Sequence, residues 1–166
     1  QTRLGIPAEF TNEGIHGLNH SRATPLPAPI AIGSTWNRAL VRRAGEIAGL
    51  EARVLGYRNV YAPILDVARD PRWGRVVECY GNCRTDPHIA PRELHQMYLY
   101  PFRRVIREAR PMGVMSSYND WDGVPVTASR YFLTDLLRHE YGFDGYVVSD
   151  SEAVEYVHTK HAVAET

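Results

Sequence analysis

The chain has 166 residues and carries equal numbers of acidic and basic side chains, 19 of each, so its formal charge is zero. This balance argues against nucleic acid or an anionic membrane as the main partner. A hydrophobic content of 44% excludes a disordered or fibrous chain. No apolar run approaches the roughly 20 residues that a membrane helix needs. We therefore expect one domain with its own core.

The N-terminal part predicts a strand, a polar loop and a helix. The apolar run at residues 6–10 is expected to be a strand, in which Pro7 is limited to the first positions. A loop with Glu13 and His16 follows. Helical spacing begins after Asn37, a favourable N-cap residue, and Gly56 is the expected stop. The apolar stripe of this helix consists of Val41, Ala44, Ala48, Ala52 and Leu55.

The rest of the chain repeats the alternation of strand and helix. Strands are expected at residues 59–67, where Pro63 interrupts the run, at 113–117 and at 145–149. Proline at a first helical turn predicts a helix from Pro91, with a kink at Pro101. Its stripe is expected to be Leu94, Tyr98, Phe102, Val105 and Ala109. A further helix is expected between Ser129 and Gly142, with Leu133, Leu136 and Leu137 facing inward.

Each expected strand ends in polar residues. Strands alternating with helices predict a parallel sheet with right-handed crossovers. Polar residues at the carboxyl ends are typical of a β/α barrel, which builds its site from the loops on one face. A complete barrel takes about 250 residues, so the fold expected here is a partial TIM-type (β/α)8 barrel, with an open α/β sheet as the alternative. The clusters are Glu13 and His16; Asp66, Arg69, Asp70 and Arg75; Tyr118, Asn119 and Asp120; and Asp150.

Asp150 directly follows the apolar run at residues 145–149. A carboxylate at the carboxyl end of a parallel strand faces the site opening of such a fold. The alternative is that Asp150 caps the following helix, which is expected from Ser151 to His158.

Several stretches, in register along the whole chain, resemble glycoside hydrolase family 3. Members of that family are retaining, exo-acting β-glycosidases. The resemblance implies that Asp150 is the nucleophile and that Tyr118 lies near it. It further implies that Arg75 binds hydroxyls of the terminal sugar and that Glu13 is a sugar-binding carboxylate. The matching stretches are residues 13–17 (EGIHG), 62–75 (APILDVARDPRWGR), 117–119 (SYN), 122–125 (DGVP) and 142–150 (GFDGYVVSD).

Two departures from the family pattern stand out. The family has a sugar-binding Lys-His pair after the Trp-Gly-Arg segment, whereas here Tyr80 leads almost directly to Pro87. The single Lys-His dipeptide, at Lys160, lies after the nucleophile. We expect one partial barrel domain over residues 1–166, with an internal deletion near residues 81–85 and no C-terminal domain. The family's acid/base comes from such a later domain, so no acid/base is assigned.

The resemblance also suggests substrates and surroundings. Glu13 is longer than the aspartate of many family glucosidases, and Ser151 stands where they often have tryptophan, so β-xylosides are favoured over β-glucosides. The expected partner is an oligosaccharide or an aryl or alkyl β-glycoside, without nucleic acid, membrane or cofactor. No signal peptide is expected within these 166 residues, and the compartment is left open, although the resemblance is compatible with a periplasmic or secreted location.

Other interpretations stay open. A metal site is one, and a carbohydrate-binding module that has lost turnover is another. The open edge of a partial barrel also suggests a homo-oligomer or a complementing segment. The cysteines are expected to be free thiols. The residues concerned are His16, His20, His158 and His161 for a metal, Trp36, Trp73 and Trp121 for sugar stacking, and Cys79 and Cys83.

Overall fold

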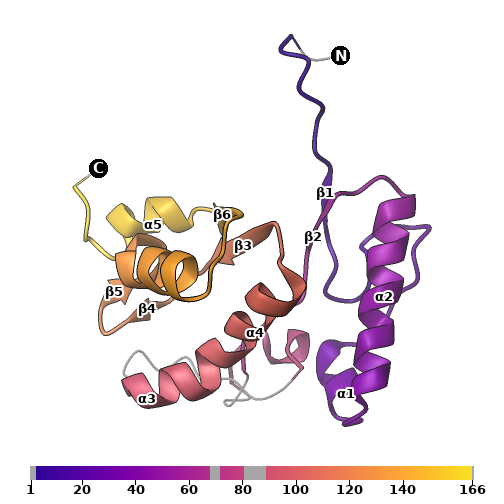
Figure 1. Ribbon diagram of the computed structural model, residues 1–166, viewed down its shortest axis with the longest axis horizontal. Coiled ribbons are helices and arrows are strands. Elements are labelled where there is room, and N and C mark those ends of the chain that lie inside the picture. Colours follow the sequence, from indigo (N-terminus) through magenta and orange to yellow (C-terminus); the bar gives the residue numbers. More distant parts are fainter. Residues whose placement is uncertain (1–2, 68–71, 81–88, 166) are drawn as a thin grey trace. The chain divides into compact units, whose positions relative to one another are not determined.

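A computed structural model describes residues 3–67, 72–80 and 89–165 of the chain (Figure 1). It divides into two compact units, Gln1–Arg84 and Thr85–Thr166. Each unit contains one pair of parallel strands, β1 with β2 in the first and β3 with β6 in the second. The predicted α/β class with parallel strands is therefore confirmed.

The long helix of the first unit, α2 (Arg38–Val54), forms as predicted. The Asn37 side chain accepts hydrogen bonds from the backbone N–H groups of Ala39 and Leu40, both at 3.1 Å. Ala44 and Ala52, on the predicted stripe, are buried. Gly56 follows with a φ of 87°, a conformation that suits glycine and ends the helix. A short helix, α1 (Pro29–Gly33), precedes α2.

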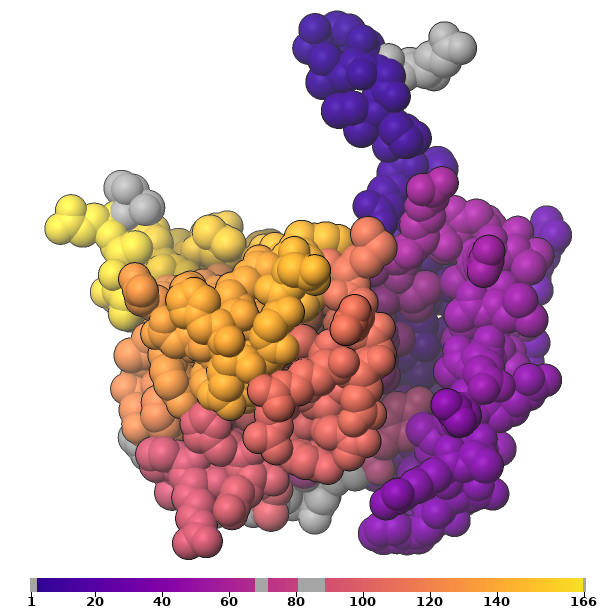
Figure 2. All heavy atoms as spheres, viewed as in Figure 1, coloured from indigo at the N-terminus to yellow at the C-terminus, as the bar shows by residue number. Residues whose placement is uncertain are grey.

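The first predicted strand is misplaced. β1 covers Thr11–Glu13 and pairs in parallel with β2 (Asn59–Tyr61), whereas residues 6–10 form no strand. Figure 2 shows residues 3–10, in indigo, extending away from α2. Phe10 keeps 63% of its surface exposed. Residues 6–10 are apolar enough for a strand, but a strand also needs a partner. β2 has only three residues, and they pair with Thr11–Glu13.

The second predicted strand is shorter than expected for a related reason. β2 stops at Tyr61, two residues before Pro63, which has no N–H to continue a ladder. Beyond the proline, Ile64 forms one isolated parallel bridge with Cys79. Cys79 is fully buried, with Ile64, Trp73 and Val76 around it. Arg69, Asp70, Cys83 and the stretch near residues 81–85 lie outside the described residues.

The second unit is built on β3 (Gly113–Ser116) and β6 (Tyr146–Ser149), which pair in parallel over all four positions. Val114 and Val147 sit opposite each other in this ladder, and both pack against the hydrophobic core. Helices supply most of that core, so they cover one face of the strand pair. The buried core residues are Ile106, Leu136, Leu137, Tyr141 and Phe143.

The helix that opens at Pro91 has three parts: α3 (Pro91–Glu93), a π-helical turn (Leu94–Tyr98) and α4 (Leu99–Ala109). Pro101 lies in the first turns of α4, directly after the π turn. The predicted stripe is wrong at its end. Ala109 is exposed, and Ile106 is buried instead.

Two further elements complete the unit. The expected helix after Ser129 forms as a π helix, Tyr131–Glu140. The hairpin of β4 (Asp120–Trp121) and β5 (Val124–Pro125) was not predicted. Its signal is present in the sequence, because an Asp-Gly pair favours a two-residue turn with both φ values positive. Asp122 and Gly123 have φ values of 50° and 79°.

Candidate active site

Asp150 stands at the carboxyl end of β6, directly after Ser149. Its Oδ1 accepts a hydrogen bond of 2.8 Å from the backbone N–H of Ser151. The following helix, α5, is Ala153–Thr159, and its N-cap position is Glu152. The expectation that Asp150 caps a helix from Ser151 to His158 is therefore wrong. The Asp150 carboxylate is engaged by the loop and not by the first turn of the helix.

Tyr118 reaches the same place from the neighbouring strand. It follows the end of β3 by two residues, and its hydroxyl donates a hydrogen bond to the backbone carbonyl of Ser151. Burial raises the pKa of Tyr118, and the neighbouring Asp150 carboxylate acts in the same direction. The phenol is therefore held in its neutral, hydrogen-donating form beside Asp150. The structure brings these two predicted site residues together.

In the first unit, Arg75 is held by Glu78, a residue that sequence reasoning missed. The Arg75 Nε and Nη2 atoms lie 2.7 and 2.6 Å from Glu78 Oε2. Residues three apart share one face of a helical turn, and Arg75 immediately precedes the 3-10 helix Val76–Glu78. That spacing is the signal that could have identified the pair. Glu78 fixes the direction in which the guanidinium points.

Arg75 also acts on Asp66. Burial raises the pKa of the Asp66 carboxyl, and the positive charge of Arg75 opposes this rise. A group with a raised carboxyl pKa favours its protonated form in the folded state. Asp66 therefore lowers the free energy of unfolding when the pH is above the pKa that an aspartate has in the unfolded chain. Below that pH the carboxyl is protonated in both states, and the effect is absent.

Replacing Arg75 with methionine should raise the pKa of Asp66 further, because the opposing charge is lost while the burial remains. NMR titration of the Asp66 carboxyl carbon measures this directly. Arg53→Met, which removes an exposed arginine near the end of α2, is the matched control and should leave the titration unchanged. An Asp66 pKa that does not move in Arg75→Met would show that the guanidinium has no influence on this carboxyl.

Glu13 is the last residue of β1 and lies opposite Tyr61 in the parallel ladder. Its carbonyl accepts a hydrogen bond of 2.9 Å from the Asn19 N–H. The Asn12 side-chain amide donates to the Asn19 carbonyl at 2.8 Å, which closes the loop after the strand. The Glu13 side chain is thus presented at a carboxyl strand end, as predicted. Glu13 and Arg75 belong to the first unit, and Tyr118 and Asp150 to the second.

The tryptophans have different surroundings. The Trp121 indole N–H donates to the Ile89 carbonyl at 2.9 Å, and its ring stacks on Tyr131 with centroids 5.9 Å apart. Trp73 packs against the Cys79 cluster. These two support the protein's interior, whereas Trp36 is 93% exposed. Within the described part of the chain, no group of three or more His, Cys, Asp or Glu side chains is placed to hold a metal ion.

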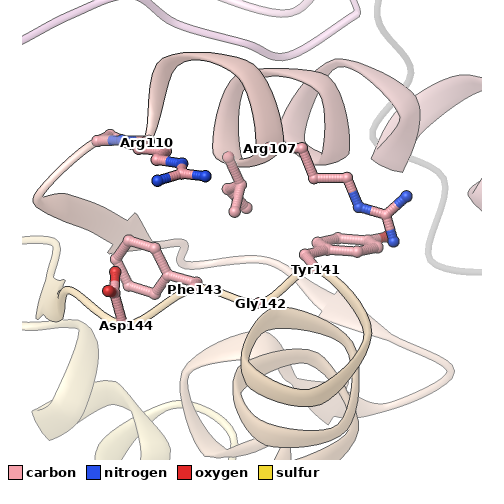
Figure 3. A pocket seen from close by; sticks show the side chains of 8 residues that line it. Arg107, Arg110, Tyr141, Gly142, Phe143 and Asp144 are labelled. Carbon is pink, nitrogen blue, oxygen red and sulfur yellow. The ribbon is translucent and has the colours of Figure 1, made fainter.

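A pocket of about 250 Å³ lies in the second unit (Figure 3). Its lining includes Arg110, which precedes β3, and Asp144, which precedes β6. Figure 3 shows Phe143 between them and Arg107 beside Tyr141. The pocket is therefore at the amino ends of the two strands. Asp150 and Tyr118 follow the carboxyl ends, so this pocket is not the candidate active site.

Parallel strands linked through helices, with polar side chains after the carboxyl strand ends, define the class as an α/β fold of the TIM-barrel type. The model of the glycosyl hydrolase family 3 N terminal domain matches the chain in two segments, residues 1–90 and 84–166. The chain belongs to this family. The predicted family and the predicted TIM-type fold are both confirmed.

Named relatives agree with this membership. A beta-xylosidase of Formosa agariphila is 31% identical over 98% of this chain and 30% of its own length. A solved β-glucosidase of Erythrobacter marinus is 32% identical with a TM-score of 0.91, over 99% of this chain and 28% of its own. The family 3 exo-β-xylosidase XlnD, in complex with a xylobiose aziridine probe, is 28% identical with a TM-score of 0.88, over 99% of this chain and 30% of its own.

The chain spans less than a third of the length of these relatives. The alignment with the Formosa beta-xylosidase covers 218 positions, more than the 166 residues of this chain. That relative therefore carries residues within the aligned region that have no counterpart here. Among the described residues, none of the helices has the length and apolar character required to span a membrane.

Proposed function

We propose that this chain is the nucleophile-bearing part of a retaining β-glycosidase that acts on terminal non-reducing β-D-glycosides. The observation that carries the proposal is that Asp150 and Tyr118 follow the carboxyl ends of two paired parallel strands, where Ser151 accepts a hydrogen bond from Tyr118 and donates one to Asp150. The names of the relatives, beta-xylosidase and β-glucosidase, support the same chemistry.

In the first step, an oxygen of Asp150 attacks the anomeric carbon and the bond to the leaving oxygen breaks. A carboxylic acid about 5–5.5 Å from the nucleophile protonates that oxygen in retaining enzymes. In the second step, water attacks the anomeric carbon, displaces Asp150 as a carboxylate and gives its proton to the residue that served as the acid in the first step. No residue of this chain is assigned as the acid, so substrates whose leaving group departs without protonation suit it best.

The other site residues support this chemistry. The neutral Tyr118 hydroxyl orients the loop that carries Asp150 and is available to respond to charge at the ring oxygen. Arg75, held by Glu78, presents a guanidinium whose parallel N–H groups suit vicinal sugar hydroxyls. Glu13 supplies a carboxylate that accepts from further hydroxyls. Contacts of these kinds are the ones that orient a sugar for attack.

Within this proposal, the preferred substrate is a β-xyloside. The longer Glu13 side chain leaves less room for an exocyclic hydroxymethyl group, and Ser151 is small where many family glucosidases have tryptophan. Exclusion of one small group from a pocket changes kcat/KM by about 10–200-fold. We expect the protein to hydrolyse 4-nitrophenyl β-xyloside at least about tenfold more efficiently than the glucoside.

The matched variant for this test is Glu13→Asp, which shortens the carboxylate without removing it. Glu13→Asp should lower the ratio of kcat/KM for the xyloside to kcat/KM for the glucoside, because it opens space beside the sugar's exocyclic carbon. A wild-type preference for the glucoside would contradict the assignment of substrate, although not the assignment of the nucleophile.

A second candidate function is carbohydrate binding without turnover. The observation that favours it is the excess of aligned residues in the beta-xylosidase relative, which this chain lacks. Titration with xylose or xylobiose, followed by calorimetry, would reveal binding. Sugar binding without a covalent adduct on Asp150 would favour this candidate over the glycosidase.

A further inference from the structure

A second tyrosine, Tyr156 of α5, packs its ring against the ring of Tyr118. The two ring centroids are 5.5 Å apart and the rings are inclined by 44°. Tyr118 lies in the segment after β3, where no helix or ladder fixes its side chain. Its orientation therefore depends on the hydroxyl bond to Ser151 and on this ring contact.

Tyr156 is itself fixed from two further directions. Its hydroxyl donates a hydrogen bond of 3.2 Å to Oε2 of Glu152. The Lys160 ammonium lies 5.4 Å from the centroid of the Tyr156 ring, within the range of a cation–π contact. Glu152 has a φ of 63°, a left-handed conformation that is unfavourable for residues other than glycine. A strained residue beside a candidate nucleophile suggests a functional constraint.

We propose that Tyr156 is a positioning residue of the candidate active site. Its ring holds Tyr118 in the orientation in which the Tyr118 hydroxyl engages the Ser151–Asp150 segment, and Glu152 holds Tyr156 in turn. Tyr156 does not act on the sugar in this arrangement. The proposal deepens the glycosidase function and rests on it, but the contact among the tyrosines can be tested separately.

The hydroxyl bond and the ring contact of Tyr156 can be removed separately by two variants. Tyr156→Phe keeps the ring and loses only the bond to Glu152, so it should slow the labelling of Asp150 by no more than about threefold, the loss expected for one exposed hydrogen bond. Tyr156→Leu removes the flat ring but keeps an apolar side chain. Because small displacements of a reacting group cost up to about 100-fold, Tyr156→Leu should slow labelling by about 10–100-fold.

The experiment measures two quantities in the protein and its variants. One is the rate at which Asp150 is labelled by 2,4-dinitrophenyl 2-deoxy-2-fluoro-β-xyloside. The other is the NMR titration of the Tyr118 Cζ carbon. Tyr100→Ala is the matched control, since Tyr100 is an exposed tyrosine on α4. Circular dichroism confirms that each variant folds, and Tyr156→Met, which also replaces the ring with an apolar side chain, takes the place of Tyr156→Leu if that variant does not fold.

The expected result is slow labelling together with a changed Tyr118 signal in Tyr156→Leu, and neither change in Tyr100→Ala. An unchanged Tyr118 signal in Tyr156→Leu would overturn the proposal, whatever happens to the rate, because the ring would not be holding Tyr118. Failure of the wild-type protein to label Asp150 at all would instead contradict the glycosidase function. The Tyr118 signal then decides alone whether Tyr156 positions it.

Discussion

Asp150→Asn is expected to lower hydrolysis of an activated aryl β-xyloside by about 10⁴-fold or more, the scale of loss seen when a covalent nucleophile is removed. Asparagine matches aspartate in size and still accepts a hydrogen bond from the Ser151 N–H. The loop should therefore keep its structure. A neutral amide cannot form the glycosyl ester, so the loss should appear in kcat. Steady-state kinetics with 2,4-dinitrophenyl β-xyloside measures it.

The matched control is Asp144→Asn, at the opposite end of the same strand. Asp144 is exposed and lines the pocket at the amino ends of β3 and β6. Its replacement changes the net charge by the same amount and should leave the rate within about twofold of the wild type, as expected for a surface substitution. Equal activity of Asp150→Asn and Asp144→Asn would exclude Asp150 as the nucleophile.

Phe143→Ala is expected to destabilise the second unit by about 3–5 kcal/mol, the cost of deleting a buried aromatic side chain. Phe143 is only 4% exposed and packs in the core with Ile106 and Leu137. The Arg138 guanidinium also lies 4.9 Å from its ring centroid. The expected loss is thus a cavity plus a lost cation contact. Urea unfolding followed by circular dichroism measures the change.

Phe10→Ala is the control for this prediction, because it removes the same side chain from an exposed position. Phe10 is 63% exposed in the segment before β1. Its replacement should change the free energy of unfolding by less than about 0.5 kcal/mol. A Phe143→Ala protein as stable as Phe10→Ala would contradict the assignment of Phe143 to the core.

The long helices could be predicted from the sequence because their signal repeats over many turns. The α2 stripe recurs at steps of three and four, and Asn37 and Gly56 mark its ends. The position of Asp150 was also predictable, because an abrupt change from apolar residues to a carboxylate marks a strand end. The resemblance to family 3 implied that Tyr118 lies near Asp150, and the pairing of β3 with β6 agrees with this, since parallel neighbours present their carboxyl ends at the same edge.

Features that depend on pairing partners were not predictable in the same way. The apolar run before β1 has the composition of a strand, but β2 pairs only with Thr11–Glu13, so the strand is limited to those residues. The contact between Tyr118 and Tyr156 joins residues far apart in the chain, so no local sequence pattern predicts it. Glu78 and the β4–β5 hairpin do have local signals in the sequence, which are the three-residue spacing to Arg75 and the Asp-Gly turn.

Covalent trapping tests the central claim most directly. Attack of Asp150 on 2,4-dinitrophenyl 2-deoxy-2-fluoro-β-xyloside forms one bond to the anomeric carbon and expels dinitrophenolate, which needs no acid to leave. The fluorine slows the second step, so the ester accumulates. Digestion and mass spectrometry should find one fluoroxylosyl group, on the peptide that contains Asp150. An adduct on a different residue, or sugar binding without any adduct, would contradict the account.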